Sequence, residues 1–409
     1  MMYSALYGRI VRGMMCIILG GILSGCNTGK GIMYYPQSDP GQARKLVVFL
    51  DGTRSKEESY TNISKLYNLV SLQDNPQITA IYLRGVGNGA DMAGMLLGSG
   101  VRKEVCKAYS FLSENYDHER GDEIYVFGFS RGAYAARMLA GFVHTAGILD
   151  LANMENTKRN SLIRNMFDAH KGDKTLEERR TAVRAISGQE VKVDEYKIEF
   201  LGLWDTVASL GLPDYDDNYY VPQTKFVDQL CNVKKAAQAL SLNDNRGSVF
   251  TPALLTDTKL IESCKEVDLD SVVNEVWFFG THSDVGGGNL DSYLSGVSLN
   301  WMINEISEYG LLPKNASVYE NRYDKTKDPL TGLGKIIYSS KSRKLIYFSS
   351  REGFRDTKLK IHQSVLDRLE FRVKTNEITL LEFFGDCFEK NDKGGYSYKP
   401  DADCFEVVP

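Results

Sequence analysis

The chain has 409 residues and a mass of 45.9 kDa, enough for one large α/β domain with insertions or for two domains. Its composition, with 43% hydrophobic and 25% charged residues, is ordinary for a globular enzyme. The formal net charge of -4 and the pI near 5.9 argue against a general nucleic-acid binder, so we expect no nucleic-acid partner.

The N-terminus has the pattern of a bacterial lipoprotein signal. Arg9 and Arg12 precede the apolar run 14–22, which is too short to span a bilayer comfortably. The run ends in Leu23-Ser24-Gly25-Cys26, with small residues before a cysteine. We therefore expect residues 1–25 to be a signal peptide and Cys26 to be lipidated. A plain secretory signal and an uncleaved anchor are the alternatives.

The residues behind Cys26 bear on location. Asn27 stands where aspartate would mark retention at the inner membrane, which favours the outer membrane or another periplasmic face of the bacterial cell envelope. Several acyl chains on one cysteine hold a protein firmly to a bilayer, so a membrane surface is an expected partner. Residues 26–43, rich in glycine and proline, are expected to form a tether.

A catalytic domain over residues 44–409 is expected to be α/β. Lys45-Leu46-Val47-Val48-Phe49-Leu50 is a continuous apolar run, typical of a strand buried on both faces. Further strand patterns alternate with helical ones: strands at 79–83, 123–127, 198–203 and 276–279, and helices at 62–69, 100–115 and 133–147. This alternation predicts a mainly parallel central sheet with helices on both faces.

Three segments interrupt the alternation. Residues 151–190 are charged and helix-prone; we favour a cap over the site, and a solvated surface insertion is the alternative. A second insertion is expected near 211–270. From about residue 313 onward the sequence is polar, and we expect an irregular C-terminal part.

Gly128-Phe129-Ser130-Arg131-Gly132 has the form of a nucleophile elbow, because it lies between a strand and a helix. Small residues are needed two places either side of the serine, where the chain turns sharply and exposes the hydroxyl. Ser130 is therefore the candidate nucleophile.

A serine hydroxyl needs a histidine to take its proton and an acid to orient that histidine. In the α/β-hydrolase arrangement these residues occur in the order Ser, Asp, His, each at the end of a strand. Asp205 follows the strand at 198–203, and His282 follows the strand at 276–279. The sequence therefore predicts an α/β-hydrolase-like fold with a triad of Ser130, Asp205 and His282.

The base and the acid of the predicted triad each have an alternative candidate. His362 is the serious alternative to His282, because late histidines also serve in this fold, and Asp284 is the substitute for Asp205. His118 and His170 lie in charged stretches and are expected to be solvated.

An oxyanion hole uses the backbone N–H after the nucleophile and another from the loop behind the first core strand. We assign these to Arg131 and to Gly52 or Thr53. Asp51 is expected to tie this loop to the neighbouring strand ends, in a supporting role.

Five cysteines remain besides Cys16 of the signal and the lipidated Cys26, and Asp386-Cys387-Phe388-Glu389 recurs as Asp403-Cys404-Phe405-Glu406. Cys387 and Cys404 are therefore a candidate disulfide in an oxidising periplasm, with buried free thiols as the alternative. The sequence has no cysteine or histidine cluster of metal-site type, so neither a metal nor a cofactor is expected.

Five motifs together resemble the DUF2235 family, the catalytic domain of Tle1-like phospholipase effectors of type VI secretion. They are Phe49-Leu50-Asp51-Gly52-Thr53, Gly128-Phe129-Ser130-Arg131-Gly132-Ala133, Gly202-Leu203-Trp204-Asp205-Thr206-Val207, Ala239-Leu240-Ser241-Leu242-Asn243-Asp244-Asn245-Arg246 and His282-Ser283-Asp284-Val285-Gly286-Gly287-Gly288. The resemblance implies a lipolytic serine hydrolase of phospholipid acyl esters, of the A type, with the triad at Ser130, Asp205 and His282. A secreted toxin is not expected to carry a lipoprotein signal, so effector and housekeeping roles both stay open.

Three other functions compete with that of a phospholipase. A haloacid-dehalogenase phosphatase would need an aspartate two residues before Asp51, where the chain has Phe49. An envelope esterase acting on carbohydrates or small molecules would use the same triad, and a non-catalytic lipoprotein scaffold would keep only the fold. The oligomeric state is not indicated by the sequence.

Overall fold

The computed structural model describes residues 31–35, 41–52, 55, 57–85, 99–171, 174–189, 195–207, 230–242, 254–256, 264, 267–289, 293–313, 359–370, 381, 384–399 and 401–409. The chain divides into two compact units, Met1–Ile32 and Met33–Pro409. The described helices and strands lie in the second unit, apart from Ile32 at the start of the first strand.

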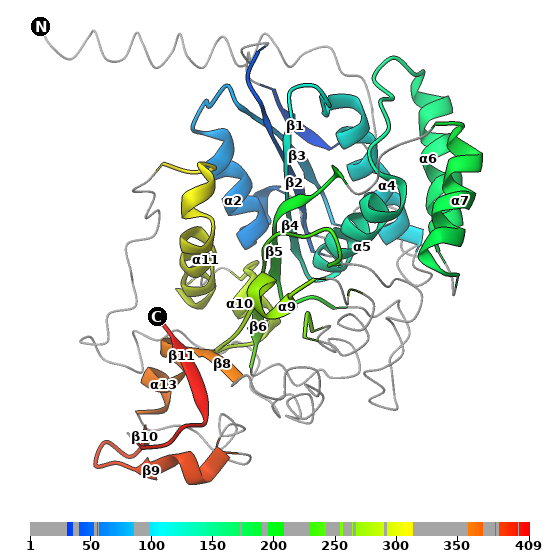
Figure 1. Cartoon of the computed structure of the whole chain (residues 1–409). Helices are drawn as coiled ribbons and strands as arrows, with labels where there is room; N and C mark the ends of the chain where they lie inside the picture. Colours follow the sequence, from blue (N-terminus) through cyan, green and yellow to red (C-terminus); the bar gives the residue numbers. More distant parts are fainter. Residues whose placement is uncertain are drawn as a thin grey trace, which may run out of the picture. The chain divides into compact units, whose positions relative to one another are not determined.

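The core of the second unit is a nine-stranded sheet with the order β1-β3-β2-β4-β5-β6-β7-β8-β11 (Figure 1). The pairs from β3 across to β11 are parallel. Its strands are β1 (Ile32–Tyr34), β2 (Lys45–Leu50), β3 (Ile78–Leu83), β4 (Glu123–Phe129), β5 (Ile198–Trp204), β6 (Ala236–Ser241), β7 (Val273–Phe278), β8 (Leu359–His362) and β11 (Phe405–Val408). The short strands β9 (Phe388–Lys390) and β10 (Tyr396–Tyr398) form a separate antiparallel hairpin.

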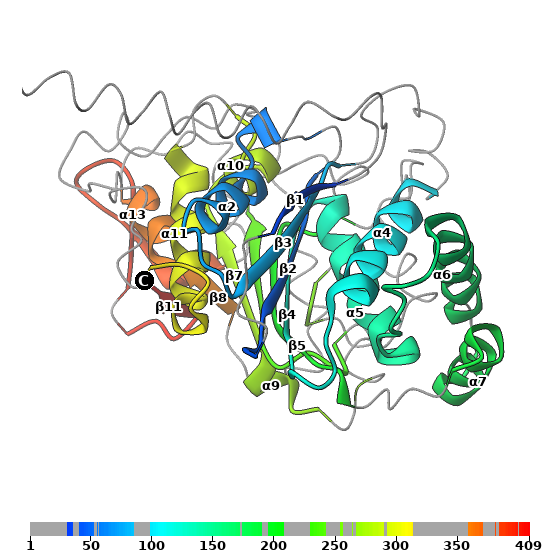
Figure 2. The same cartoon turned by 90° about the horizontal axis from the view of Figure 1, so that it is seen from above.

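Helices cover both faces of this sheet, which confirms the predicted α/β-hydrolase-like class (Figures 1 and 2). One face carries α2 (Asn62–Ser71) and α11 (Tyr293–Glu305), and the other carries α4 (Ser99–Asn115) and α5 (Arg131–Ala146). The remaining helices are α6 (Asn156–His170), α7 (Leu176–Ser187), α9 (Leu269–Val272), α10 (His282–Gly286), α13 (Gln363–Leu369) and the 3-10 turns η1 (Glu57–Ser59), η3 (Ser307–Tyr309) and η7 (Gly385–Cys387).

The apolar runs form strands because parallel strands covered by helices are buried on both faces. Every residue of β3 and β6 is buried, as are all but the first residue of β2 and β4. The register pairs Leu50 with Gly128 and Phe129 with Trp204. The chain segments that leave β2, β4 and β5 therefore start at one edge of the sheet, where the predicted reactive groups lie.

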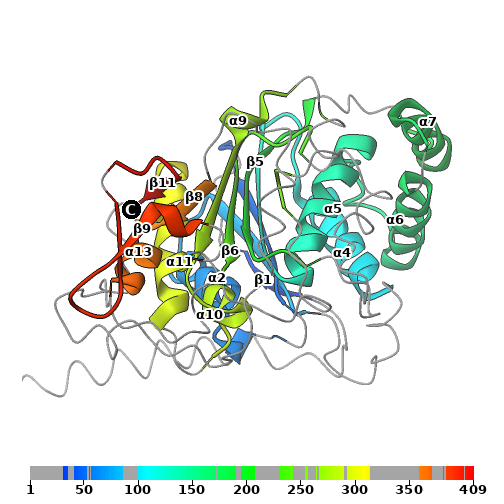
Figure 3. The ribbon, with the colours of Figure 1, turned by 90° about the horizontal axis from the view of Figure 1, so that it is seen from below.

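Helices α6 and α7 lie outside α4 and α5, away from the sheet (Figure 3). Arg159 of α6 donates to Ser110 of α4 at 3.1 Å, and Arg180 of α7 donates to the carbonyl of His144 near the end of α5. Helices α6 and α7 thus pack as an outer layer on this helical face, and α7 contacts the end of α5 that is remote from Ser130. These contacts support a surface insertion at 151–190 and contradict the expected cap over the site.

Two other sequence expectations need correction. The expected insertion at 211–270 contains β6, a strand of the sheet between β5 and β7. The C-terminal part contributes β8 and β11 to the same sheet and is therefore not irregular where it is described.

Several predictions concern residues outside the described ranges. They include the signal peptide, Cys26, most of the tether and Thr53. Among the residues that the structure describes, no helix has the length and apolarity to cross a bilayer.

Candidate active site

Ser130 lies on a strained turn between β4 and α5. Its backbone φ is 58° and ψ is -126°, a conformation that costs a non-glycine residue about 1–3 kcal/mol and is common at functional sites. Its N–H donates to the carbonyl of Trp204 at the end of β5, at 3.0 Å. The turn is therefore fixed against the neighbouring strand.

The glycines on either side of Ser130 are required by space. A Cβ atom on Gly128 would lie 2.5 Å from Cα of Ala133, and one on Gly132 would lie 2.2 Å from the carbonyl oxygen of Leu50. At both glycines the nearest atoms belong to the backbone of a neighbouring element, which cannot move aside as a side chain could. The spacing of the two glycines thus reflects the close packing of α5 against β2 and β4.

Ser130, His282 and Asp205 form one line of hydrogen bonds. Nε2 of His282 lies 2.8 Å from Oγ of Ser130, and Nδ1 of His282 lies 2.6 Å from Oδ2 of Asp205. All three residues are at most 5% exposed. The structure thus brings together three residues that are 77 and 152 positions apart in the sequence.

The carboxylate of Asp205 is held by Ser241, the last residue of β6. The N–H of Ser241 donates to Oδ1 and its hydroxyl donates to Oδ2, both at 3.0 Å. Asp205 itself has a φ of 40°, and its N–H donates to the carbonyl of Ala239 at 2.7 Å. Ser241 lies in one of the family motifs, at 239–246, but the sequence alone indicates no role for it, because the run 236–241 does not have a typical strand pattern.

Phe129 supports the imidazole of His282. The two rings are tilted by 31°, with centroids 4.7 Å apart. Atoms of the same phenyl ring lie where a Cβ on Gly286 or Gly52 would be, at 1.9 Å and 2.8 Å. The ring therefore packs between the turn of His282 and the loop behind β2, and it leaves room only for glycine at both.

Asp51 ties the loop behind β2 to its surroundings. Oδ1 accepts from the N–H of Gly52 at 2.6 Å, and Oδ2 accepts from the hydroxyls of Thr61, at 2.7 Å, and Tyr82. Complete burial raises the pKa of Asp51 to about 6, and these three hydrogen bonds limit the rise.

The three residues expected to supply oxyanion donors are differently placed for that role. The N–H of Gly52 already donates to Asp51, so it is not directed toward a substrate in this arrangement. Arg131 begins α5, where the helix dipole and the first-turn N–H groups favour negative charge. Thr53 lies outside the described residues.

Asp284 caps the short helix of His282. Its Oδ2 accepts from the N–H of Thr281 at 2.9 Å and from its hydroxyl at 2.7 Å, and its Oδ1 accepts from Asn289 at 2.9 Å. The carboxyl of Asp284 is therefore used in holding the turn, whereas Asp205 contacts the imidazole.

The competing histidines have other partners. Nδ1 of His362 accepts from the N–H of Ser364 at 3.1 Å and caps α13, and burial lowers the pKa of His362 to about 4. His170 was expected to be solvated, but it is buried, and its Nδ1 lies 2.9 Å from the hydroxyl of Thr145. His118 is exposed and contacts the hydroxyl of Tyr196.

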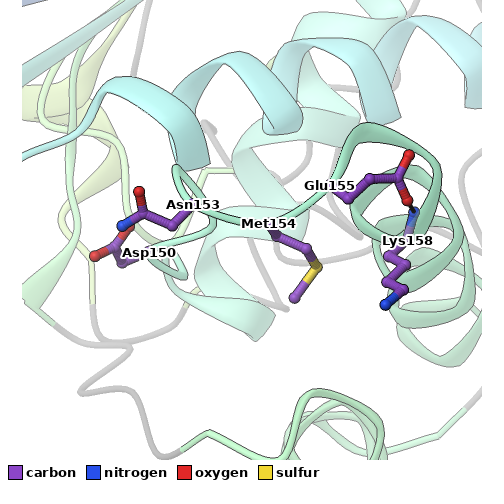
Figure 4. Close-up of a pocket in the computed structure, with 5 residues that line it drawn as sticks. All are labelled: Asp150, Asn153, Met154, Glu155 and Lys158. Carbon is purple, nitrogen blue, oxygen red and sulfur yellow. Dashed lines mark hydrogen bonds between the residues drawn. The ribbon is translucent and has the colours of Figure 1, made fainter.

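A hollow of about 500 Å³ lies at the segment that joins α5 to α6 and at the first turn of α6 (Figure 4). It is lined by Asp150, Asn153, Met154, Glu155 and Lys158. The carboxylate of Glu155 caps α6 by accepting from the N–H groups of Thr157 and Lys158. No arrangement of a nucleophile with a base appears among these five residues.

Two disulfides are formed. Cys387 pairs with Cys404, which confirms the pairing suggested by the repeated motif, and Cys231 pairs with Cys264. Among the described cysteines, Cys106 is free and buried.

The chain is similar to known proteins in sequence and in structure. A sequence model of a family described as the type VI secretion system phospholipase effector, Tle1-like, catalytic domain matches residues 44–305. An uncharacterized protein of Saccharomyces cerevisiae is 30% identical over an aligned length of 204 residues, covering 45% of this chain and 30% of the yeast protein.

Two solved structures are similar over part of the chain. An uncharacterized protein from Pseudomonas aeruginosa has 17% identity and a TM-score of 0.37, covering 64% of this chain and 45% of that one. The Tle1 effector bound to the VgrG spike has 17% identity and a TM-score of 0.32, covering 62% and 52%. The chain spans less than two thirds of the length of each of these three proteins.

Proposed function

The chain belongs to the family of Tle1-like catalytic domains of type VI secretion phospholipase effectors, and from this premise we propose that it is a serine hydrolase that cleaves acyl esters of phospholipids. The observation that carries the proposal is the line of hydrogen bonds from Ser130 through His282 to Asp205. Three side chains joined in this way can generate a nucleophile at neutral pH.

Ser130 acts as the nucleophile. Its Oγ attacks the carbonyl carbon of the ester while Nε2 of His282, 2.8 Å away, accepts the hydroxyl proton. Asp205 keeps the imidazole in the tautomer with its proton on Nδ1 and stabilises the cation that forms. The product of this step is a tetrahedral intermediate with an oxyanion.

The intermediate then collapses. The bond to the glycerol oxygen breaks, His282 returns the proton to this oxygen, and the lysophospholipid leaves an acyl-Ser130 behind. Water deprotonated by His282 attacks the acyl carbon and releases the fatty acid. The N–H of Arg131 and that of Thr53 would stabilise the oxyanion, each being worth on the order of 3 kcal/mol.

A fluorophosphonate probe tests the mechanism. We expect it to label wild-type protein and not Ser130→Ala. Ser364→Ala is the matched control, because Ser364 is as buried as Ser130 and its hydroxyl also lies 2.8 Å from a histidine nitrogen. Labelling that survives in Ser130→Ala would refute the assignment, and labelling is expected to persist in Ser364→Ala.

Release of fatty acid from phosphatidylethanolamine or phosphatidylglycerol vesicles tests the substrate. Substrates labelled separately at the two acyl positions would identify the bond that an A-type enzyme cleaves. Activity confined to short, soluble acetyl esters would instead favour the envelope esterase. A protein that neither reacts with the probe nor cleaves esters would be a scaffold.

We propose a location on the cell envelope, with the membrane bound through lipidated Cys26. The signal pattern supports this location, and so do the disulfides Cys231–Cys264 and Cys387–Cys404, because disulfides persist in oxidising compartments. Replacing Cys26 by alanine should move the protein from the membrane fraction to the soluble fraction. An unchanged membrane fraction would contradict lipidation at Cys26.

A further inference from the structure

The start of helix α2 contacts both the loop behind β2 and the turn that carries His282. The hydroxyl of Thr61, the N-cap residue of α2, donates to Oδ2 of Asp51 at 2.7 Å and accepts from the N–H of Ser64 at 3.1 Å. Oδ1 of the same carboxylate holds the N–H of Gly52. A single carboxylate therefore links Thr61 to the candidate oxyanion loop.

On its other side, the same segment holds the turn of His282. Thr61 forms an antiparallel bridge with Gly287, and the N–H of Gly288 donates to the carbonyl of Tyr60 at 3.2 Å. A Cβ on Gly287 would lie 2.7 Å from the backbone N of Asn62, and Gly287 has a φ of 85°. The two backbones are therefore in direct contact.

Asn62 adds a side-chain bond to this contact. Its Nδ2 donates to the carbonyl of Val285, inside α10, at 2.9 Å, and to the carbonyl of Ser295 in α11, also at 2.9 Å. The hydroxyl of Ser298 donates to the same Val285 carbonyl at 2.6 Å. Asn62 is fully buried, so these bonds are shielded from water.

We propose that Thr61 and Asn62 are positioning residues that couple the oxyanion loop to the turn of His282. The inference rests on the proposed function and adds residues to it. His282 is the first residue of α10, and the carbonyl of Val285 in this helix accepts a hydrogen bond from Asn62. The N–H of Gly52 donates to Asp51, whose carboxylate also accepts from the hydroxyl of Thr61. Loss of either bond allows the base or the loop behind β2 to shift relative to Ser130.

The effect is expected on the chemical step. A displacement of about 1 Å in a catalytic group can lower the rate about a hundredfold. Thr61 is only 1% exposed, so we expect no direct contact between its side chain and the substrate. Thr61→Val keeps the shape of the side chain but removes the hydroxyl. We expect its kcat on phospholipid vesicles to fall about ten- to a hundredfold, with KM within about twofold of wild type.

Two matched variants separate positioning from helix capping. Thr61→Ser retains the hydroxyl and should restore most of kcat. Thr175→Val removes another N-cap threonine, at the start of α7, where the hydroxyl accepts from the N–H of Glu178 at 3.3 Å. It should lower stability in a similar way and leave kcat unchanged.

Ser298→Ala provides a milder test should Thr61→Val not fold. It removes one of the two donors to the Val285 carbonyl and should slow both turnover and inactivation by the fluorophosphonate probe severalfold. Unchanged rates in Thr61→Val or, where that variant does not fold, in Ser298→Ala would overturn the coupling. Failure of Ser130→Ala to abolish labelling would instead overturn the proposed function, so the two failures are distinguishable.

Discussion

Ser241 holds both carboxylate oxygens of Asp205, through its backbone N–H to Oδ1 and its hydroxyl to Oδ2, each at 3.0 Å. Oδ2 also faces Nδ1 of His282 at 2.6 Å. The direction in which Asp205 presents its charge is therefore set from the neighbouring strand β6. Orientation of the acid depends on a side chain that is itself fully buried.

Ser241→Ala should lower kcat about tenfold. The substitution keeps the N–H bond to Oδ1 and removes the hydroxyl bond to Oδ2, and hydrogen bonds to charged groups contribute about 1.5–3 kcal/mol. Steady-state hydrolysis of phospholipid vesicles would measure the change. Ser113→Ala is the control, because Ser113 is equally buried but donates its hydroxyl only within α4, to Tyr109. An equal loss of activity in both variants would argue against orientation of Asp205.

His282→Ala should abolish fatty-acid release, whereas His362→Ala should retain it. His362 stacks on Phe278 with ring centroids 4.7 Å apart and caps α13, so its loss affects stability and not proton transfer. Because the substitution removes a buried ring, the free energy of unfolding should fall by a few kcal/mol. Initial rates normalised to folded protein distinguish the two effects. An active His282→Ala protein would transfer the role of base to another group.

The parts of the site that could be predicted are those encoded in local sequence. The run at 45–50 predicts β2 with its bounds, and the elbow glycines follow from steric contacts that hold wherever a strand turns into a helix in this way. Asp205 and His282 could be chosen because Asp205 directly follows an apolar strand and His282 lies four residues beyond the end of another. Their mutual distances could not be predicted, because they depend on the order of strands in the sheet.

The errors have physical causes. Ala236-Ala237-Gln238-Ala239-Leu240-Ser241 lacks β-branched and aromatic residues, so β6 gave no strand signal, and Ser241 was missed with it. His170 precedes a charged stretch, yet tertiary packing buries it beside Phe142 and Phe167. Pairing of Cys231 with Cys264 likewise depends on a contact between segments 33 residues apart.

Gly132→Ala should destabilise the protein, whereas Gly296→Ala should stabilise it. A methyl group on Gly132 would lie 2.2 Å from the carbonyl of Leu50, and one on Gly296, inside α11, meets nothing within 4 Å. Overpacking of this kind costs about 3 kcal/mol, whereas replacing glycine within a helix gains about 0.5–1 kcal/mol. Urea unfolding of both variants measures the difference. Equal stability of the two would show that α5 can move away from β2 without penalty.

Glu104 of α4 should make stability depend on pH. Its side chain is buried, and neither carboxyl oxygen has a hydrogen-bond partner among the described residues. Burial raises the pKa of Glu104 well above its usual value, although the charges of Lys107 and Arg131 oppose the rise. The folded protein thus holds a proton that the unfolded chain releases near its ordinary pKa of about 4.3.

The sign follows from proton linkage. Where the folded state binds more protons than the unfolded state, the free energy of unfolding falls as pH rises, here from about pH 4 up to the raised pKa of Glu104. The side chain of Glu104→Gln has no proton to release, so its stability does not fall in this way. The free energy of unfolding of the variant, relative to that of the wild type, should therefore be higher at pH 8 than at pH 5. Each unit of raised pKa contributes about 1.4 kcal/mol to this gain. Urea unfolding at the two pH values measures it, with Glu308→Gln, at an exposed site on η3, as the control. An equal pH dependence in wild type and Glu104→Gln would mean that Glu104 finds a partner for its charge in the folded protein.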